Sequence, residues 1–529
     1  MKLSATGKFL HMKRRTLKLW ILRVLVSLGS LTLLYYYSWW SVSGRITDPL
    51  LILALLAAIL YSGLQIVGSW VLYLAARRPA PATAPLSSPT VDVFVAACGE
   101  PYALVRRALV AACTMRGNHR TWLLDDGHDA ALAELAGLLG AGYLTRTDRK
   151  HAKAGNLNAA LERTNGDIIV IFDVDHAPAP EFLEKTLAYF SDPQIGFVQV
   201  MPTFINGKES WVARAAGETS LDFYNPISLG MNRIGSTTLM GSNALIRRTA
   251  LESIGGYQAG LAEDLATSVA LHAAGWHSAY VAEPLAPGFA PPDLRAWFTQ
   301  QLKWAHGVFE VMLTSFPRLF PRLTWYQRLS YGLRMTYYWS GPVAGIHLAL
   351  ALLVLMFGDS RAQASLEEYL ISLMPLVFSF LLIRQMALRS WRHPSIVAVL
   401  LWRAIVLIYA TWPIYTFAWI MAVLRMPLEF RPTPKSAHGK IHPIWLLPQF
   451  AAVISLTAVL LYAILVNHNT PLLLILFGLA QLVPQLILLW QWVHPNISVQ
   501  VHENILALND PSTPDFSNPI KQPSHVIGN

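Results

Sequence analysis

Residues 168–176 read Ile-Ile-Val-Ile-Phe-Asp-Val-Asp-His, an apolar run that stops at two carboxylates. A run that is apolar at every position fits a strand buried on both faces, as in a parallel sheet. Open sheets of this kind bind ligands beyond the carboxyl ends of their strands. Side chains two residues apart on an extended strand point the same way, so Asp173 and Asp175 can converge. Such a pair suits a hard divalent cation, although a lone Asp-x-Asp is also common in polar turns.

Predicted strands and helices alternate around this run. The order favours an α/β domain with a mostly parallel sheet. The expected strands cover residues 91–97, 122–124, 168–173 and 197–201, and the expected helices cover residues 104–115, 130–139 and 181–190. The strand at 122–124 ends in Asp125-Asp126-Gly127. We therefore expect acidic groups from two βα units at the same edge of one sheet.

The composition indicates a membrane protein with a sizeable soluble part. Of the 529 residues, 54% are hydrophobic and 14% are charged, against roughly 25% charged in soluble domains. The net charge of +10 could suggest nucleic acid as a partner. However, the basic residues cluster beside apolar spans, and the positive-inside rule explains them more simply. We expect no nucleic-acid partner.

The hydrophobic pattern predicts about six transmembrane helices, with interfacial helices beside them. The expected organisation is a cytosolic stub and two spans at residues 1–78, a linker at 79–90, the α/β domain at 91–312, interfacial helices and two spans at 313–425, a basic loop at 426–443, two spans at 444–493 and a disordered tail at 494–529.

Residues 397–424 are ambiguous. They are long and apolar enough to span, but Arg403 and Pro413 interrupt them. A crossing here would place the basic loop outside, against the charge rule. We interpret the segment as interfacial or re-entrant.

Two further motifs have plain structural interpretations when taken alone. Glu263 and Asp264 stand at the start of a predicted helix, where acidic residues commonly act as caps or dipole partners. Gln300 and Trp304 lie four residues apart in another predicted helix, and this spacing also fits an ordinary amphipathic face.

Taken together, the motifs resemble the processive family 2 glycosyltransferases of the bacterial cellulose synthase catalytic subunit type. The resemblance runs from about residue 91 to residue 435. The matching pieces, in the order of that family, are Asp125-Asp126-Gly127, residues 151–158, Asp173-Val174-Asp175-His176, Glu263-Asp264, residues 300–304 and residues 430–435.

The resemblance implies a GT-A type domain between transmembrane helices and a role for each matched residue. These roles are nucleotide-sugar binding by Asp125, Asp126, Lys153 and Lys303, metal binding by Asp173 and Asp175, catalysis by Asp264 as general base beside Glu263, acceptor binding by Gln300 and Trp304, and gating by Phe430, Thr433 and Lys435 in a loop that closes over UDP.

The activity implied by the resemblance is processive and inverting. A nucleotide sugar, with UDP-glucose favoured, would be polymerised with Mg²⁺ or Mn²⁺ into a β-1,4-glucan or related β-linked polysaccharide, and exported through the transmembrane helices. The protein would lie in the inner (plasma) membrane with its catalytic domain in the cytosol. A periplasmic or envelope export subunit is a further expected partner.

Other functions remain open at this stage. They are a different β-glycan (mannan, an N-acetylglucosamine polymer or a mixed-linkage glucan), sugar transfer to a polyprenyl phosphate lipid, and a transporter or scaffold with an inactive transferase domain. The elements at 300–304 and 430–435 favour the polymerising enzyme over lipid transfer. Intact Asp173, Asp175 and Asp264 argue against an inactive domain.

Overall fold

The structure is a computed structural model. It describes residues 5–41, 49–79, 89–357, 366–394, 401–429, 432–434, 441–467, 470–495 and 497–498. Phe430 and Lys435 of the expected gating loop lie outside the described residues. So do most of the linker at 79–90 and most of the tail at 494–529.

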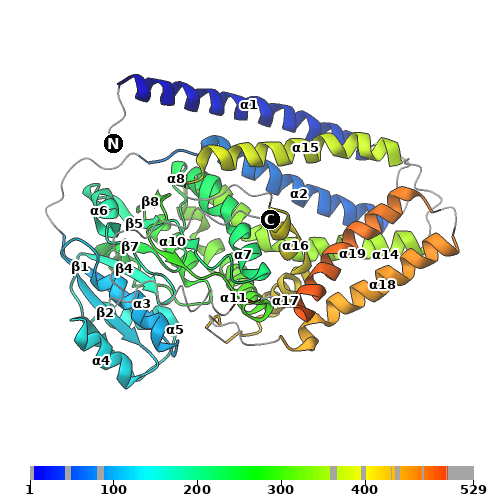
Figure 1. Ribbon diagram of the computed structural model, residues 1–529. Helices are drawn as coiled ribbons and strands as arrows, with labels where there is room; N and C mark the ends of the chain where they lie inside the picture. Colours follow the sequence, from blue (N-terminus) through cyan, green and yellow to red (C-terminus); the bar gives the residue numbers. More distant parts are fainter. Residues whose placement is uncertain are drawn as a thin grey trace, which may run out of the picture.

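A seven-stranded sheet forms the centre of the α/β domain (Figure 1). Its order is β3-β2-β1-β4-β7-β5-β8. The strands are β1 (Val91–Ala97), β2 (Arg120–Asp125), β3 (Gly142–Leu144), β4 (Ile168–Asp173), β5 (Ile195–Val200), β7 (Ala244–Arg247) and β8 (His277–Val281). Only β7 runs antiparallel to its neighbours in this sheet. The predicted, mostly parallel sheet is therefore confirmed.

Both faces of the central strand β4 are buried, as its continuous apolar sequence predicts. Val170 and Phe172 belong to the core on one face, and Ile169 and Ile171 belong to the core on the other. Because side chains alternate along a strand, an apolar residue at every position serves both cores. The carboxyl ends of β4 and β2 consequently lie at one edge of the sheet.

Helices cover the sheet and extend the domain toward the membrane part. They are α3 (Tyr102–Cys113), α4 (Ala130–Leu138), α5 (Ala152–Leu161), α6 (Phe182–Thr186), α7 (Trp211–Asp222), α8 (Ser228–Arg233), α9 (Arg248–Ser253), α10 (Glu263–Ala273) and α11 (Leu294–Leu313). The helix predicted at 181–190 is divided into α6 and a 3₁₀ turn at Leu187–Ser191. A two-stranded sheet pairs β6 (Thr203–Phe204) with β9 (Pro287–Gly288).

Six helical segments in the described part of the chain are long and apolar enough to cross a membrane. They are Leu17–Ser41, Ile52–Ala75, Trp325–Met356, Glu367–Trp391, Pro443–Leu465 and Leu472–Val493. The corresponding helices are α1 (Ala5–Ser41), α2 (Pro49–Ala75), α13 (Trp325–Met335) with α14 (Ser340–Phe357), α15 (Leu366–Trp391), α18 (Leu447–Leu465) and α19 (Leu472–Val493). They extend away from the sheet in Figure 1. The number agrees with the prediction.

The ambiguous segment forms a bent helix pair, α16 (Trp402–Ala410) and α17 (Trp412–Val423), which meet at 45°. The bend fits both a broken span and a re-entrant segment. The pair is tied to the α/β domain by buried polar contacts: Trp297 donates to Thr411 Oγ1 at 2.9 Å, and Tyr415 donates to Gln301 Oε1 at 2.8 Å. Since Trp297 and Gln301 lie on α11, the pair fixes α11 against the membrane helices.

Candidate active site

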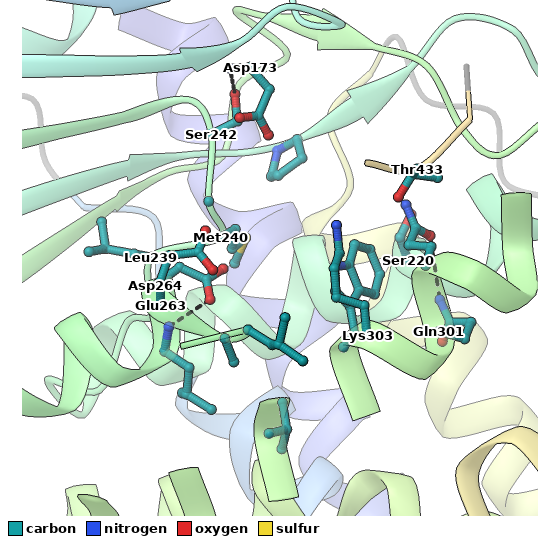
Figure 2. A pocket seen from close by; sticks show the side chains of 18 of the residues that line it. Asp173, Ser220, Leu239, Met240, Ser242, Glu263, Asp264, Gln301, Lys303 and Thr433 are labelled. Carbon is teal, nitrogen blue, oxygen red and sulfur yellow. Dashed lines mark hydrogen bonds between the residues drawn. The ribbon is translucent and has the colours of Figure 1, made fainter. Parts of the chain in front are cut away.

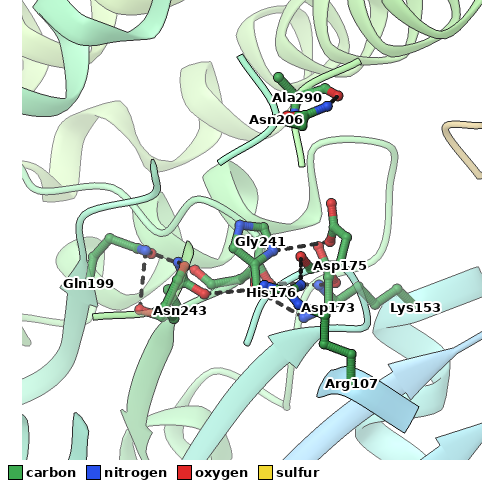
Figure 3. Close-up of polar contacts among 12 residues, drawn as sticks. Arg107, Lys153, Asp173, Asp175, His176, Gln199, Asn206, Gly241, Asn243 and Ala290 are labelled. Atoms are coloured by element: carbon green, nitrogen blue, oxygen red, sulfur yellow. Dashed lines mark hydrogen bonds and ion pairs between the residues drawn. The ribbon is translucent and has the colours of Figure 1, made fainter. Parts of the chain in front are cut away.

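The loop after β4 brings three potential metal ligands together (Figure 3). One ligand atom each from Asp173, Asp175 and His176 lies within 4.8 Å of the others. The turn is held by the backbone: His176 N–H donates to Asp173 O at 3.0 Å, and Asp173 N–H donates to Ser242 Oγ at 3.0 Å. The structure thus brings Asp173 and Asp175 together as the sequence predicts.

His176 completes this group, and the sequence analysis assigned it no role. Its Nδ1 lies 3.0 Å from Asp175 Oδ1, and its Nε2 is buried with no hydrogen-bond partner among the described residues. A Cβ at position 288 would lie 2.7 Å from Nε2, so the close packing here requires Gly288. Two carboxylates with one imidazole form a donor set that accommodates a divalent cation. Its place directly after the Asp-x-Asp motif was the signal in the sequence.

Lys153, in the first turn of α5, faces the same loop. Its ammonium contacts the Asp173 carboxylate and donates to Gly241 O at 2.6 Å. Burial by itself would lower the pKa of Lys153, but the negative charges of Asp173, Glu263 and Asp264 raise it overall. Lys153 is therefore charged at neutral pH and lies beside the candidate metal ligands.

Arg107 supports the loop from below and was not expected from the sequence. It is buried on α3, with Nη1 3.4 Å from Asp175 O and the guanidinium 5.1 Å from the centre of the Phe289 ring. Burial lowers its pKa to about 10, and the opposing effect of Asp175 is smaller. The only sequence signal was an arginine on an otherwise apolar helix face.

The two acidic residues at the start of α10 lie close to Gly241. Leu265 N–H donates to Asp264 Oδ1 at 2.7 Å. Gly241 has φ +80°, and a Cβ there would lie 3.6 Å from Asp264 Oδ2. Burial raises the pKa of both Glu263 and Asp264, and the proximity of Asp264 raises the pKa of Glu263 further. A carboxylate with a raised pKa is suited to accept a proton near neutral pH.

Asp125 and Asp126 take different positions although they are adjacent. Asp125 is fully buried and accepts hydrogen bonds from the backbone of Gly127 and Asp129 and from the Tyr143 hydroxyl, at 2.7, 2.8 and 2.9 Å. It holds the turn after β2. Asp126 forms a two-point ion pair with Arg146, at 2.8 and 2.7 Å.

A cavity of about 500 Å³ joins these groups (Figure 2). Every predicted site residue that the structure describes, except Asp125, contributes to its lining. These residues are Asp126, Lys153, Asp173, Asp175, Glu263, Asp264, Gln300, Lys303, Trp304 and Thr433. Figure 2 shows Glu263 and Asp264 on one side, Lys303 and Thr433 on the other, and Asp173 toward the sheet.

The cavity continues toward the membrane helices. Its lining there includes Asp222, Arg334, Tyr337, Tyr338, Arg384 and Tyr415. The charged members of this set carry no signal in the sequence, because they lie on three separate helices and form no motif.

Comparison with known proteins agrees with this arrangement. Residues 89–307 match the family model described as "Glycosyltransferase like family 2", and residues 247–424 match "Cellulose synthase". The chain is 33% identical to cellulose synthase 2 of Novacetimonas hansenii over 397 residues, covering 71% of this chain and 24% of that protein. It is 34% identical to the cellulose synthase catalytic subunit of Xanthomonas axonopodis pv. citri over 338 residues, covering 60% and 46%. The chain thus spans less than half the length of these two curated relatives.

A solved structure shares the fold. It is a mannosyltransferase from Pyrobaculum calidifontis, in complex with GDP-mannose and Mn²⁺. The match has a TM-score of 0.50 at 17% identity and covers 72% of this chain and all of that one. The α/β domain has a GT-A-like glycosyltransferase fold. The chain thus carries a region that matches the family 2 glycosyltransferases, followed by an overlapping region that matches cellulose synthase.

Proposed function

We propose that this protein is a processive, inverting hexosyltransferase. It polymerises a nucleotide sugar, UDP-glucose in the first instance, into a β-linked glucan and passes the product between its membrane helices. One observation carries the proposal: a single cavity is lined by Asp173 and Asp175, by Asp264, and by tyrosines of the membrane part. Donor, acceptor and exit would thus share one continuous space.

At the sheet edge, Asp173, Asp175 and His176 would hold Mg²⁺ or Mn²⁺ against the donor diphosphate. The cation, when bound, neutralises charge on the departing nucleotide diphosphate. Lys153 and Lys303 line the same region and add positive charge beside the phosphates. Arg107 lies beneath the loop and donates to the backbone oxygen of Asp175 at 3.4 Å, which supports the position of Asp175.

Asp264 would act as the general base. As the acceptor oxygen bonds to the anomeric carbon, the bond from that carbon to the diphosphate oxygen breaks. The acceptor proton passes to the Asp264 carboxylate. A single displacement inverts the anomeric centre, so an α-linked donor gives a β-linked product without a covalent enzyme intermediate.

Gln300 and Trp304 would position the acceptor. Gln300 is buried, whereas Trp304 is 37% exposed and lines the cavity, so its indole is accessible to a sugar ring. Thr433, also in the lining, belongs to the segment that resembles a gating loop. Closure of that loop over the nucleotide would exclude water and limit hydrolysis of the donor.

The six candidate spans make this a multi-pass membrane protein. We further propose that it lies in the inner (plasma) membrane of a bacterium with the α/β domain in the cytosol, where nucleotide sugars are made. A subunit of the envelope or periplasm would receive the polymer.

The test is to incubate purified protein in detergent or vesicles with a panel of UDP- and GDP-sugars and Mg²⁺ or Mn²⁺. Nucleotide release and ethanol-insoluble product are both measured, with Asp264→Asn as the control. A polymer that forms from UDP-glucose and is digested by a β-glucanase supports the proposal. A lipid-linked monosaccharide as the sole product contradicts polymerisation, and a polymer from a different donor corrects the sugar. No turnover with any donor, in vesicles that retain bound Mn²⁺ and nucleotide, contradicts activity of the isolated chain.

A further inference from the structure

The segment that joins α11 to the third candidate span carries a basic surface. Residues 311–335 contain four arginines and no acidic residue. Two of these, Arg318 and Arg322, are exposed in the last turns of α12 (Ser315–Leu319) and of the 3₁₀ turn Phe320–Arg322. Neither forms an ion pair or a hydrogen bond with any residue that the structure describes. Their charges are therefore available to a partner outside this chain.

Exposed aromatic and apolar side chains accompany these arginines. They are Phe320, Trp325, Tyr326 and Leu329. The rings of Trp325 and Tyr326 stack with their centres 3.6 Å apart. Arg328 holds the turn before them, since its Nε donates to Phe320 O and its Nη2 donates to Pro321 O, each at 2.8 Å. A turn fixed in this way presents its apolar side chains outward, and a contiguous apolar surface of this kind is unfavourable in water.

The position of this surface relative to the membrane indicates its partner. The candidate span that includes α13 begins at Trp325, so the exposed rings lie at one end of an apolar helical segment. Tryptophan and tyrosine concentrate at the level of lipid headgroups, where an apolar ring and a polar edge are both accommodated. Guanidinium groups bind phosphate oxygens and are attracted to anionic lipids. Exposed arginines beside exposed rings at the end of a span therefore fit the headgroups of anionic phospholipids.

The other side of the same segment packs against α10, the helix that begins with Glu263 and Asp264. Three of its buried residues share a core with three residues of α10: Leu323, Tyr331 and Met335 with Leu265, Ala266 and Val269. A polar contact adds to this core, because the Tyr331 hydroxyl lies 2.7 Å from His272 Nδ1. A lipid that fixes the outer side of this segment would thus also fix the helix that carries the proposed general base.

We propose that residues 315–329 bind the headgroups of anionic phospholipids, and that this contact holds α10 in its catalytic position. Arg318 and Arg322 bind lipid phosphates, and Trp325 and Tyr326 lie among the headgroups. The lipid contact goes beyond the proposed function and does not depend on it. Its effect on catalysis rests on the proposed function, because it states a lipid requirement for that turnover.

The first test measures lipid binding without turnover. The full-length protein in detergent is mixed with phosphatidylglycerol or with phosphatidylcholine of the same acyl chains, and Tm is recorded. We expect phosphatidylglycerol to raise Tm by about 2 °C or more above the value in phosphatidylcholine, because a ligand that binds only the native state stabilises it. Glycerol 3-phosphate, which has the phosphate without acyl chains, should leave Tm unchanged.

The second test measures turnover in vesicles of phosphatidylcholine, with and without added phosphatidylglycerol, at saturating donor. Nucleotide release should be about fivefold faster with phosphatidylglycerol, which is a typical coupling between two sites. Repulsion of the anionic donor by a negatively charged membrane would act in the opposite direction, so it cannot produce this increase.

Charge variants identify the residues that respond to the lipid. Arg318→Gln/Arg322→Gln should lose both effects of phosphatidylglycerol and keep the wild-type Tm and turnover in phosphatidylcholine. Arg318→Lys/Arg322→Lys retains the charges and should retain most of both effects. The matched control is Arg120→Gln/Arg163→Gln, which removes two arginine charges from exposed positions of the α/β domain. It should respond to phosphatidylglycerol as the wild-type protein does.

Four results would overturn the lipid contact. They are equal Tm values in the two lipids, an undiminished effect of phosphatidylglycerol on Tm in Arg318→Gln/Arg322→Gln, equal stabilisation by glycerol 3-phosphate, and a Tm of Arg318→Gln/Arg322→Gln in phosphatidylcholine below that of the wild-type protein. The third result would indicate a site for a soluble anion, and the fourth would assign these arginines to the fold.

The effect on catalysis is refuted if phosphatidylglycerol raises Tm but not turnover. Failure of the proposed function is read separately, as absent nucleotide release in every lipid with any donor. The Tm measurements would still decide the lipid contact in that case.

Discussion

The two ends of the cavity are built differently. At the sheet end, the ammonium of Lys153 contacts Asp173, and Asp126 forms a two-point ion pair with Arg146. At the membrane end, Asp222 contacts both Tyr73 and Arg384, while the buried Nε and Nη2 atoms of Arg334 have no hydrogen-bond partner among the described residues. Acidic groups thus outnumber basic ones in the cavity lining of the first region, whereas in the second one carboxylate lies near two guanidinium groups.

This difference indicates what each end is organised to do. Ion-paired groups at the sheet end form a fixed arrangement, which accelerates the chemical step because little reorganisation is needed. At the membrane end, Asp222 of α7 connects to α2 through Tyr73 and to α15 through Arg384. Substitutions at the sheet end should therefore change turnover, and substitutions at the membrane end should change binding or stability.

The largest effect is expected from Asp264→Asn. An amide cannot take the acceptor proton, so kcat should fall by about 10²- to 10⁴-fold. Binding of nucleotide with Mn²⁺ should stay within about twofold, as Asp264 is not among the expected metal ligands. Single-turnover nucleotide release and calorimetry measure the two quantities. If kcat and nucleotide affinity fall by the same factor, Asp264 contributes to donor binding, and the proposed difference between the two ends of the cavity is wrong.

Asp222→Asn tests the membrane end through stability. The variant leaves Arg384 without its carboxylate, and loss of one partner from a largely buried ion pair should cost about 2 kcal/mol after allowance for partial exposure. Thermal unfolding in detergent should show a lower Tm. The double variant Asp222→Asn/Arg384→Gln should regain much of this loss. If the loss of stability in the double variant equals the sum of the losses in the two single variants, Asp222 and Arg384 are not energetically coupled.

The pH profile of turnover tests whether Asp264, at the sheet end, is the general base. A base with a raised pKa loses activity as pH falls through that pKa, so the acid limb should lie above the ordinary aspartate range of about 4. Lys153 lowers the pKa of Asp264. Lys153→Gln should therefore move the limb of the residual activity up. Lys208→Gln, which removes the same charge from an exposed position elsewhere, should leave it in place. An unmoved limb in Lys153→Gln would mean that another group titrates.

The sheet end was largely predictable from the sequence, and the membrane end was not. Asp173 and Asp175 stand at the end of a continuous apolar run. Both the run and its polar end can be recognised locally, so the nine residues 168–176 were enough to predict the strand and the site. The β7 strand, antiparallel between β4 and β5, carried no local signal, because strand direction is decided by tertiary pairing. Asp222, Arg334 and Arg384 meet only after three helices pack, and each one alone resembles an ordinary polar residue near a membrane surface.

The smallest effect is expected from Gly241→Ala. This variant tests whether turnover depends on the backbone geometry of the sheet end as well as on its charged groups. Gly241 has φ +80°, and alanine there should cost about 1 kcal/mol of stability. Gly235→Ala is the matched control, since Gly235 has φ +68° with open space around its would-be Cβ. Both variants should lower Tm alike. Only Gly241→Ala should also lower kcat, by a few-fold, because relief of the strain at φ +80° would shift Gly241 O, which accepts from Lys153 at 2.6 Å. Equal kcat in the two variants would show that catalysis tolerates a small displacement of the backbone at Gly241. The two ends of the cavity would then differ in their charges but not in how closely their geometry is required.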